Sequence, residues 1–488
     1  MGDLILVIDA GTTSTRAMLF GTDGACLGCE QRELAQHYPR PGWVEHDAEE
    51  IWASSLVCAL KMVDRAGGAS RIAALGITNQ RETIVFWSRR SGRALAPAIV
   101  WQDRRTADLC ARLKEEGEEP GLQERTGLLL DPYFSASKIA WALEHWPELR
   151  EAGDDLCVGT VESWLVFRLT DGLHVSDATN ASRTALMDVR TGLWDSALID
   201  LFGVPTRSLP EIVDCASEVG RTLPDHFGAP LAIAGRAGDQ QAAAIGQACF
   251  ADGDTKATYG TGAFILTNTG EHFRSSANRL LSTIACQIEG RRSYALEGSV
   301  FVAGSLIKWL RDELGLIASA DETERLASSV PDSGGVQLVP ALAGLGAPHW
   351  SPDARAAISG LSFSAGRAHL VRAALESMAN QTHDLMRAFA ADGARWERLK
   401  IDGGMATNDW IAQDLADMLD LTVERPRFVE TTALGAAMLA GVGCGLFRSL
   451  DEAASMRGDV TRFEPEIDPE TRERRLEGWS DAVERVLR

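Results

Sequence analysis

Four hydroxyl residues follow one glycine near the start of the chain, in LVIDAGTTSTRAMLF at residues 6–20. Apolar runs enter and leave this stretch, which indicates two strands joined by a short turn. Such a turn needs one glycine, and it does not need Thr12, Thr13, Ser14 and Thr15 together. Hydroxyls and backbone N–H groups at one turn suit phosphate oxygens. This stretch alone is compatible with two interpretations, a solvated hairpin and a phosphate-binding turn.

Asp9 stands directly before that turn. A carboxylate and a phosphate repel each other, and a bridging Mg²⁺ would remove the repulsion. A second turn of similar composition occurs in ATYGTGAFIL at residues 257–266, where strands resume in the second half of the chain. The two turns together favour phosphate binding more than either turn does alone.

A third glycine turn lies in IDGGMATND at residues 401–409, between an apolar strand and a helix expected to begin near Asn408. A strand–Gly-Gly–helix unit lets a phosphate or a flat ring approach the backbone closely. The stretch matches neither GxGxxG nor the Walker pattern GxxxxGK[ST]. P-loop enzymes and simple Rossmann dehydrogenases are therefore disfavoured.

The elements that must position these turns form an α/β pattern in two halves. The first 36 residues predict a strand meander, and a helix follows with Asp47 as its N-cap and Glu50 at the capping-box position. IAALGIT and TIVFW predict a second strand pair, with the polar tetrad NQRE between them. We expect two domains, residues 1–248 and 249–488, with a cleft between them.

The composition disfavours several classes of partner. The 488 residues contain 48 Lys and Arg against 69 Asp and Glu, a formal charge of −21. This excess of acid argues against nucleic acid and anionic membranes as partners. The start MGDLILVIDAG has no basic n-region and no small-residue cleavage site, so no signal peptide is expected. The uncharged stretch TTALGAAMLAGVGCGLF contains four glycines and is short for a membrane span, which favours a helix packed against a sheet.

Cysteines are scattered along the chain, nine in all. Cys26 and Cys29 form a lone CxxC, but no second pair and no neighbouring His completes a zinc site. The other cysteines are expected to be small core residues in a reducing compartment, and the cytoplasm is the expected location.

A series of short motifs runs in order from Leu4 to about Leu446: DAGTTSTR, ITNQRET, WQDRR, DPYFSASK, NASRT, GDQQAA, YGTG, ALEG, GLGAP and DGGMATN. This series resembles the glycerol kinases of the FGGY carbohydrate kinase family, within the actin, hexokinase and Hsp70 ATPase superfamily. YGTG is unspecific, whereas TNQRET, GDQQ and DPYFS are specific for the glycerol kinases. The resemblance implies two duplicated ribonuclease H-like ATPase domains with a central cleft, and a kinase that uses ATP, Mg²⁺ and glycerol.

The resemblance assigns the glycerol hydroxyls to Arg81 and Glu82. A guanidinium donates and a carboxylate accepts, so two neighbouring residues can hold one diol. Taken alone, the pair would be interpreted as a surface ion pair, which contributes little. By resemblance, four further residues add hydrogen bonds or wall off the carbon chain: Tyr133, Gln240, Trp101 and Phe264.

Asp239, in AGDQQ, is the candidate catalytic base. A primary alcohol is a poor nucleophile, and its proton must leave as the O–P bond forms. A carboxylate within hydrogen-bond reach of the hydroxyl can take that proton. Positioning and neutralising the transferring phosphoryl group do most of the remaining work.

By resemblance, ATP bridges the two halves of the chain, and Asp9 helps to hold Mg²⁺ through water. Closure of the hinge would then exclude water from the γ-phosphate. The residues expected near the nucleotide are Thr12, Thr13, Ser14 and Arg16 at the phosphates, Thr261 and Gly304 along the phosphate path, and Gly404 and Asn408 at the nucleoside end.

Two positions depart from the family pattern. Ala10 stands where glycerol kinases usually have Gln, and many FGGY sugar kinases have an apolar residue there. Lys308 stands where the family usually has Gln near the nucleotide. A lysine donates only, so it either contacts a nucleotide phosphate or ribose, or points to solvent.

The leading hypothesis is ATP-dependent phosphorylation of glycerol to sn-glycerol 3-phosphate in glycerol catabolism. An alternative within the family is a kinase for another small polyol or sugar, such as erythritol or dihydroxyacetone. An alternative of another class is a non-catalytic actin-like or Hsp70-like ATPase module, for which the charged end DPETRERRLEGWSDAVERVLR is expected to leave no peptide-binding domain. The sequence leaves the oligomeric state undecided, with a homodimer and a homotetramer as the alternatives.

Overall fold

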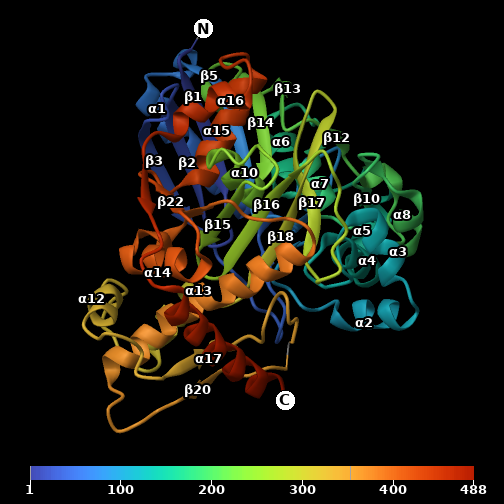
Figure 1. The fold of residues 1–488 in the computed structure, drawn as a ribbon. Helices are drawn as coiled ribbons and strands as arrows, with labels where there is room; N and C mark the ends of the chain where they lie inside the picture. The colour runs from blue at the N-terminus through green and yellow to red at the C-terminus, as the bar shows by residue number, and fades with distance from the viewer. Residues whose placement is uncertain (1, 352) are drawn as a thin grey trace.

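The computed structural model of the chain describes residues 2–351 and 353–488 (Figure 1). Its first sheet has six strands in the order β13-β14-β5-β1-β2-β3. The strands β1, β5 and β14 run parallel, and β1, β2 and β3 form the antiparallel meander that the sequence predicts. The strands are β1 (Leu4–Ala10), β2 (Ser14–Gly21), β3 (Cys26–Glu33), β5 (Ile72–Asn79), β13 (Ala216–Arg221) and β14 (Ala232–Gly238).

Both faces of β1 are buried, which explains why this strand is apolar at nearly every position. Side chains alternate between the faces of a strand. Leu6 and Ile8 pack in one core with helix α1 (Ala48–Ala66). Ile5 and Val7 pack in another core with α15 (Thr431–Gly443), which comes late in the chain. Figure 1 shows this red helix beside the blue strand β1 and the green strand β14.

Helix α15 also packs tightly on α10 (Asp239–Gly246). A Cβ added to Gly435 would lie 1.8 Å from the carbonyl oxygen of Ala242, and one added to Gly246 would lie 2.0 Å from that of Thr431. Glycine at these two positions therefore lets the helices meet backbone to backbone. The uncharged stretch is thus a small-residue helix on a sheet, as predicted.

The second sheet has seven strands in the order β17-β18-β16-β15-β21-β22-β23. It repeats the pattern of the first: an antiparallel β15-β16-β18 unit, two parallel neighbours, β21 and β22, and an antiparallel edge strand, β23. The strands are β15 (Thr255–Tyr259), β16 (Ala263–Gly270), β17 (Leu281–Ile288), β18 (Arg291–Val300), β21 (Leu399–Asp402), β22 (Val423–Pro426) and β23 (Val460–Phe463).

The two faces of the second sheet have different neighbours. One face forms a large core with α11 (Gly304–Asp312), α12 (Glu322–Ser328), α13 (Arg367–Ala391) and α14 (Asp409–Leu419). The other face packs against α10, which also contacts β5 and β14 of the first sheet. Helix α10 therefore lies between the two sheets.

A third sheet, β4-β7-β6-β8, adjoins the first half. Its strands are β4 (Glu45–His46), β6 (Ile84–Ser88), β7 (Ala98–Ile99) and β8 (Leu156–Thr160). The helices of the first half include α2 (Ala107–Glu115), α3 (Glu119–Thr126), α4 (Ser135–His145), α5 (Pro147–Ala152), α6 (Val161–Leu169), α7 (Ala178–Ser182), α8 (Ser196–Phe202) and α9 (Pro224–Phe227).

Short strands form three further pairs among the described residues, and two helices lie near the end of the chain. The pairs are β9 (Val175–Asp177) with β12 (Glu211–Val213), β10 (Met187–Asp188) with β11 (Leu193–Trp194), and β19 (Gln337–Val339) with β20 (Ala357–Ser359). The helices are α16 (Leu450–Ala453) and α17 (Pro469–Leu487). Each described helix is too short or too polar to cross a membrane.

Two local predictions are wrong. IAALGIT and TIVFW form β5 and β6, but the two strands belong to different sheets and do not pair. Asp47 does cap α1 by accepting the N–H of Glu49, whereas the Glu50 carboxylate accepts the N–H of Ala35 on the preceding segment. Glu50 thus ties down the chain that enters the helix instead of closing a capping box.

Candidate active site

Arg81 and Glu82 lie where the chain passes from β5 of the first sheet to β6 of the third. Their side chains are almost fully buried, with 2% and 1% of their surface exposed. Glu82 has a φ of 61°, a backbone conformation that few non-glycine residues adopt and that persists only where the surroundings impose it. The interpretation of the pair as a surface ion pair is therefore wrong.

A buried network of charges surrounds this pair. Arg81 Nη1 and Nη2 donate to Oε2 and Oε1 of Glu297 at 2.6 and 3.2 Å. Arg183 donates through Nη2 to the same Oε1 at 3.0 Å and through Nε to Oε1 of Glu82 at 2.5 Å. Burial raises the pKa of Glu82. For Glu297, burial acts in the same direction, but Arg183 and Arg81 outweigh it and hold the pKa at about 2.

Asp239 is the first residue of α10, and its carboxylate stands at the margin of this network. Oδ1 lies 3.2 Å from Nε of Arg81 and accepts the N–H of Gln240 at 2.8 Å. One third of the side chain, 33%, is exposed, unlike the other carboxylates of the network. Burial raises the pKa of Asp239, although Arg81 and Lys256 oppose the shift. An accessible carboxylate of raised basicity suits a general base.

Three aromatic rings stand together beside these charges. Trp101 meets Tyr133 edge to face with ring centroids 5.7 Å apart, and it meets Phe264 at 6.3 Å. Trp101 Nε1 donates to Oγ1 of Thr12 at 2.9 Å, so this ring joins the first hydroxyl-rich turn to the aromatic group. The Tyr133 hydroxyl accepts from Nη2 of Arg81 at 3.4 Å. The residues predicted for the polyol site are thus neighbours.

Lys138 fixes the turn that carries Tyr133. Its Nζ donates to the carbonyl oxygens of Pro132 and Tyr133 at 2.5 and 2.6 Å. Lys138 is fully buried, and burial lowers its pKa to about 8. The lysine of DPYFSASK therefore shapes the site from behind.

Lys256 of β15 plays a similar part for Gln240. Its Nζ donates to Oε1 of the Gln240 side chain and, at 2.9 Å, to Oγ1 of Thr258. Burial lowers the pKa of Lys256. Because an ammonium group only donates, this contact fixes which end of the Gln240 amide is oxygen, and Nε2 remains the donor end.

Asp9 and Arg16 face each other across β1 and β2. Oδ2 of Asp9 lies 2.6 Å from Nη2 of Arg16, whose Nη1 lies 2.7 Å from Glu430 directly before α15. Burial raises the pKa of Asp9, and Arg16 opposes the shift. The predicted metal residue is thus held in place by a cation that links it to the second half of the chain.

The first turn offers its hydroxyls unequally. Thr13 is exposed, Thr12 and Ser14 are half-buried, and the fully buried Thr15 shares a hydrogen bond of 2.8 Å with Ser55. Thr15 is therefore a packing residue, and the other three remain candidates for phosphate contacts. A single carboxylate beside such a turn fits Mg²⁺, which keeps several waters and takes its other ligands from substrate phosphates.

The second turn meets the start of α11. The N–H groups of Gly304 and Ser305 donate to the carbonyl oxygens of Gly260 and Thr261 at 2.9 and 3.1 Å. A Cβ added to Gly304 would lie 2.5 Å from the Gly260 oxygen and 3.2 Å from Cγ of Met405. Glycine at this position thus lets the YGTG turn, the start of α11 and the loop that carries Met405 come close together.

The other residues predicted for the nucleotide differ in their surroundings. Gly404 is exposed, and a Cβ added to it would have open space within 4 Å. Asn408 caps α14 by accepting the N–H of Ile411 at 3.1 Å, and it donates to Oγ1 of Thr323 at 3.2 Å, so its side chain has a structural role. Lys308 is exposed on α11, and no described contact joins it to another predicted site residue.

Sequence reasoning missed four charged residues of the site: Arg183, Glu297, Lys256 and Lys138. Three of them stand in the motifs NASRT, ALEG and DPYFSASK, which carry the family resemblance. A usable signal exists for Lys256, the one charged residue of β15, and for Glu297, which stands in the otherwise uncharged run SYALEGSV after the two arginines that open β18. Such residues are almost never fully buried unless they are paired.

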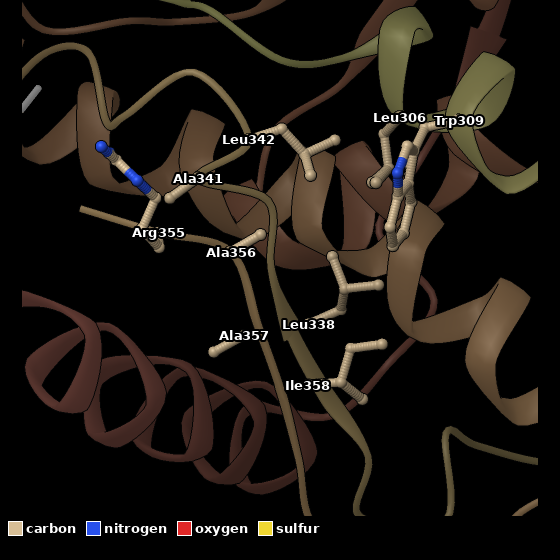
Figure 2. Close-up of a pocket in the computed structure, with 9 residues that line it drawn as sticks. All are labelled: Leu306, Trp309, Leu338, Ala341, Leu342, Arg355, Ala356, Ala357 and Ile358. Atoms are coloured by element: carbon tan, nitrogen blue, oxygen red, sulfur yellow. The ribbon is translucent and has the colours of Figure 1, made fainter. Parts of the chain in front are cut away.

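A separate hollow lies in the second half of the chain (Figure 2). Its volume is about 350 Å³, and its lining is mostly apolar. Figure 2 shows that the lining comes from α11, from the β19–β20 pair and from the segment that joins them: Leu306, Trp309, Leu338, Ala341, Leu342, Arg355, Ala356, Ala357 and Ile358. None of the predicted site residues lines it, so it is distinct from the candidate active site.

Two repeated sheets, a turn with Gly and Thr in each, and an accessible carboxylate on the helix between them define an ATP-dependent phosphotransferase of the duplicated ATPase fold. The chain belongs to the FGGY family of carbohydrate kinases. The N-terminal domain of that family matches residues 4–246, and its C-terminal domain matches residues 255–444.

Relatives match over nearly the full length. A glycerol kinase of Gluconobacter oxydans is 56% identical over 99% of this chain and 96% of its own. One of Methylobacterium nodulans is 53% identical over 99% and 98%. The crystal structure of Plasmodium falciparum glycerol kinase with ADP has a TM-score of 0.93 at 36% identity and covers 99% of this chain and 98% of its own. A xylulose kinase of Lactobacillus acidophilus, at 20% identity and a TM-score of 0.88 over 99% and 98% of the two chains, shares the fold.

Proposed function

We infer that the protein transfers the γ-phosphoryl group of ATP to glycerol and releases sn-glycerol 3-phosphate. The observation that carries this inference is the pairing of Arg81 and Glu82 in the protein interior beside the accessible carboxylate of Asp239. A buried donor and a buried acceptor side by side suit vicinal hydroxyls, and they reject an apolar ligand that would leave them unpaired. Full-length identity above 50% to glycerol kinases supports the choice of substrate.

Three aromatic rings would limit the length of the substrate. Trp101, Tyr133 and Phe264 form a compact group whose ring centroids are 5.7 and 6.3 Å from that of Trp101. A three-carbon chain presents little apolar surface, so a rigid wall close to the hydroxyl-binding groups favours glycerol over longer polyols. Ala10 lies at the end of β1, outside this group of rings, so we do not expect it to change the choice of polyol.

Asp239 is the proposed general base. Its described contacts both involve Oδ1, which leaves Oδ2 as the atom that accepts the proton of the attacking hydroxyl. As that proton moves to Asp239, the hydroxyl oxygen forms its bond to the γ-phosphorus and the bond from phosphorus to the bridging oxygen of ATP breaks, with ADP leaving. Neighbouring Arg81 favours the ionised form of this carboxylate and so opposes the effect of burial on its pKa.

The phosphates of ATP are proposed to lie between the turn that joins β1 to β2 and the turn that joins β15 to β16. Thr12, Thr13 and Ser14 would face them from the first side, and Thr261 and Gly304 from the second. Gly404 leaves room for the nucleoside, and the side chain of Asn408 supports that loop. Asp9 would hold Mg²⁺ through water, and the ion would neutralise phosphate charge. Arg16 holds Asp9 in place. The exposed Lys308 is proposed to contact a phosphate or ribose oxygen of the nucleotide.

The protein is proposed to act in the cytoplasm, because all nine cysteines are unpaired thiols.

A substrate panel tests the function. Purified protein with ATP and Mg²⁺ is assayed for ADP release with glycerol, erythritol, dihydroxyacetone and xylulose, and the glycerol product is identified by mass. We expect kcat/KM for glycerol to exceed that for each other substrate at least about tenfold, since a site of this kind rejects a poorly paired analogue strongly. A higher value for another polyol would overturn the choice of substrate, and ATP turnover independent of any polyol would favour an ATPase module.

A further inference from the structure

Glu297 reaches the polyol site from the second half of the chain. It lies on β18 opposite Leu266, and its neighbour Ser299 lies opposite Phe264. Residues directly opposite each other in an antiparallel pair share a face of the sheet. Glu297 and Phe264 therefore project from the same face of the second sheet, toward the residues of the first half that form the polyol site.

The Glu297 carboxylate holds the two terminal nitrogens of the Arg81 guanidinium. The contacts are 2.6 Å from Nη1 to Oε2 and 3.2 Å from Nη2 to Oε1, a bidentate arrangement that fixes the plane of the guanidinium. Oε1 also accepts from Arg183, which in turn binds Glu82. A single buried carboxylate thus orients both residues that are proposed to bind the substrate.

Almost every N–H group of the Arg81 guanidinium already has an acceptor in the protein. Nε faces Asp239 at 3.2 Å, Nη1 donates to Glu297 and, at 3.3 Å, to Oε1 of Gln241, and Nη2 donates to Glu297. The second N–H of Nη2 has the longest contact, 3.4 Å to the Tyr133 hydroxyl. That N–H is the donor most easily transferred to a substrate hydroxyl.

The same arrangement limits the contact between Arg81 and Asp239 to Nε of Arg81 and one carboxylate oxygen, Oδ1, at 3.2 Å. Without Glu297, Nη1 and Nη2 would be buried donors with no carboxylate, and the nearest one still accessible would be Asp239. A bidentate pair with Arg81 would occupy both oxygens of Asp239, including the one proposed to take the proton. A buried charge that loses its partner is strongly destabilised, which would drive this rearrangement.

We propose that Glu297 is a positioning residue for phosphoryl transfer: it holds Arg81 in the orientation that binds glycerol and keeps Arg81 from closing on Asp239. The residue acts across the boundary between the two halves, because it stands on the second sheet and Arg81 stands beside the first. This inference rests on the proposed function, since it concerns how the same site binds glycerol.

The test compares Glu297→Gln with the charge-retaining Glu297→Asp. Glutamine has one accepting oxygen and a donating NH₂ group in place of the second oxygen, so it cannot receive Nη1 and Nη2 of Arg81 on separate atoms as Glu297 does. We therefore expect Glu297→Gln to raise KM for glycerol at least about tenfold and to lower kcat, while KM for ATP changes less than about threefold. Glu297→Asp keeps the charge and should recover part of both losses. The glycerol affinity of each variant is also measured by calorimetry without ATP, which reports on the site independently of turnover.

A matched control breaks a buried ion pair elsewhere in the second half. Asp414 of α14 accepts from Nη1 and Nη2 of Arg475 at 2.6 and 3.0 Å, and its side chain is 5% exposed. Asp414→Asn should lower the midpoint of urea unfolding and leave KM for glycerol unchanged. If it raised KM for glycerol as much as Glu297→Gln does, the effect would be general destabilisation and the proposal would be overturned.

Two further outcomes separate this proposal from the proposed function. A wild-type protein that does not phosphorylate glycerol contradicts the function. An active wild type, together with a folded Glu297→Gln variant whose glycerol affinity and KM stay within about twofold of wild type, contradicts the positioning role. If Glu297→Gln does not fold, the calorimetric affinity of Glu297→Asp decides, because moving the carboxylate back by one methylene must weaken a bidentate contact.

Discussion

Replacement of Asp239 by Asn probes the chemical step directly. The amide has nearly the same volume as the carboxylate and can still accept the N–H of Gln240, which lies 2.8 Å from Oδ1, so α10 should begin as before. It cannot take a proton from the attacking hydroxyl. Arg81 keeps Glu297 as a bidentate partner, so the loss of one carboxylate should not displace it.

The magnitude follows from the role assigned to the carboxylate. General base catalysis contributes about 10² to 10⁴ in rate. With about 1.4 kcal/mol for each factor of ten, Asp239→Asn should raise the activation free energy by about 3 to 6 kcal/mol. Removal of one negative charge beside the proposed phosphate path does not oppose an anionic substrate, so KM for ATP should stay within about threefold of wild type.

The assay is steady-state release of ADP with glycerol and ATP varied in turn, with urea unfolding as a check on folding. Asp195→Asn is a matched control, because Asp195 is also an aspartate at the start of a helix, α8, with one arginine partner, Arg125 at 2.8 Å. The control should keep full turnover. A folded Asp239→Asn variant with kcat within tenfold of wild type would refute the assignment of the base.

Three other substitutions test parts of the structure around the site. Lys256→Met frees the Gln240 amide to rotate and should raise KM for glycerol roughly tenfold; an unchanged KM would contradict the orientation assigned to that amide. Glu162 is a fully buried residue of α6 that accepts a hydrogen bond from Ser176. Burial raises its pKa from the ordinary 4.5 to about 7, so the folded state binds the proton more tightly and the free energy of unfolding falls as pH rises through this window, by up to about 3 kcal/mol. Glu162→Gln should reduce the pH dependence of the urea unfolding midpoint between pH 5 and pH 8. If the midpoint of the variant changed with pH as much as that of wild type, Glu162 would not be the source of the pH dependence. Gly435→Ala places a Cβ 1.8 Å from the Ala242 carbonyl oxygen and should cost about 1 to 3 kcal/mol in urea unfolding, whereas an unchanged midpoint would mean that α10 and α15 can separate freely.

The first hairpin of each sheet could be predicted because its signals are local. Apolar runs around Gly-Thr turns gave β1 with β2 and β15 with β16, and the structure has both hairpins. The sheets to which β5 and β6 belong could not be predicted in the same way. Adjacent strands usually pair, but here the connection that carries Arg81 and Glu82 crosses to another sheet, and sequence proximity gives no sign of that crossing.

The candidate site shows the same division. Residue chemistry and family motifs led to Arg81, Glu82, Asp239 and the three aromatic residues, and the structure places them as neighbours. Glu297 was not assigned a role, because its partner Arg81 is 216 residues away in the sequence and only the register of β18 brings them together. Long-range charge pairing of this kind has no local pattern from which to infer it.

Helix α15 has a consequence for how the protein is made. It covers one face of β1, β5 and β14, yet it is not complete until Gly443, about two hundred residues after β14 ends at Gly238. At a synthesis rate of about 5 to 20 residues per second, that face waits roughly 10 to 40 seconds for its cover. During this interval the apolar face of β1, β5 and β14 is exposed on the growing chain and can bind other molecules before α15 covers it. The first half of the nascent protein is therefore the part that we expect to need a chaperone most.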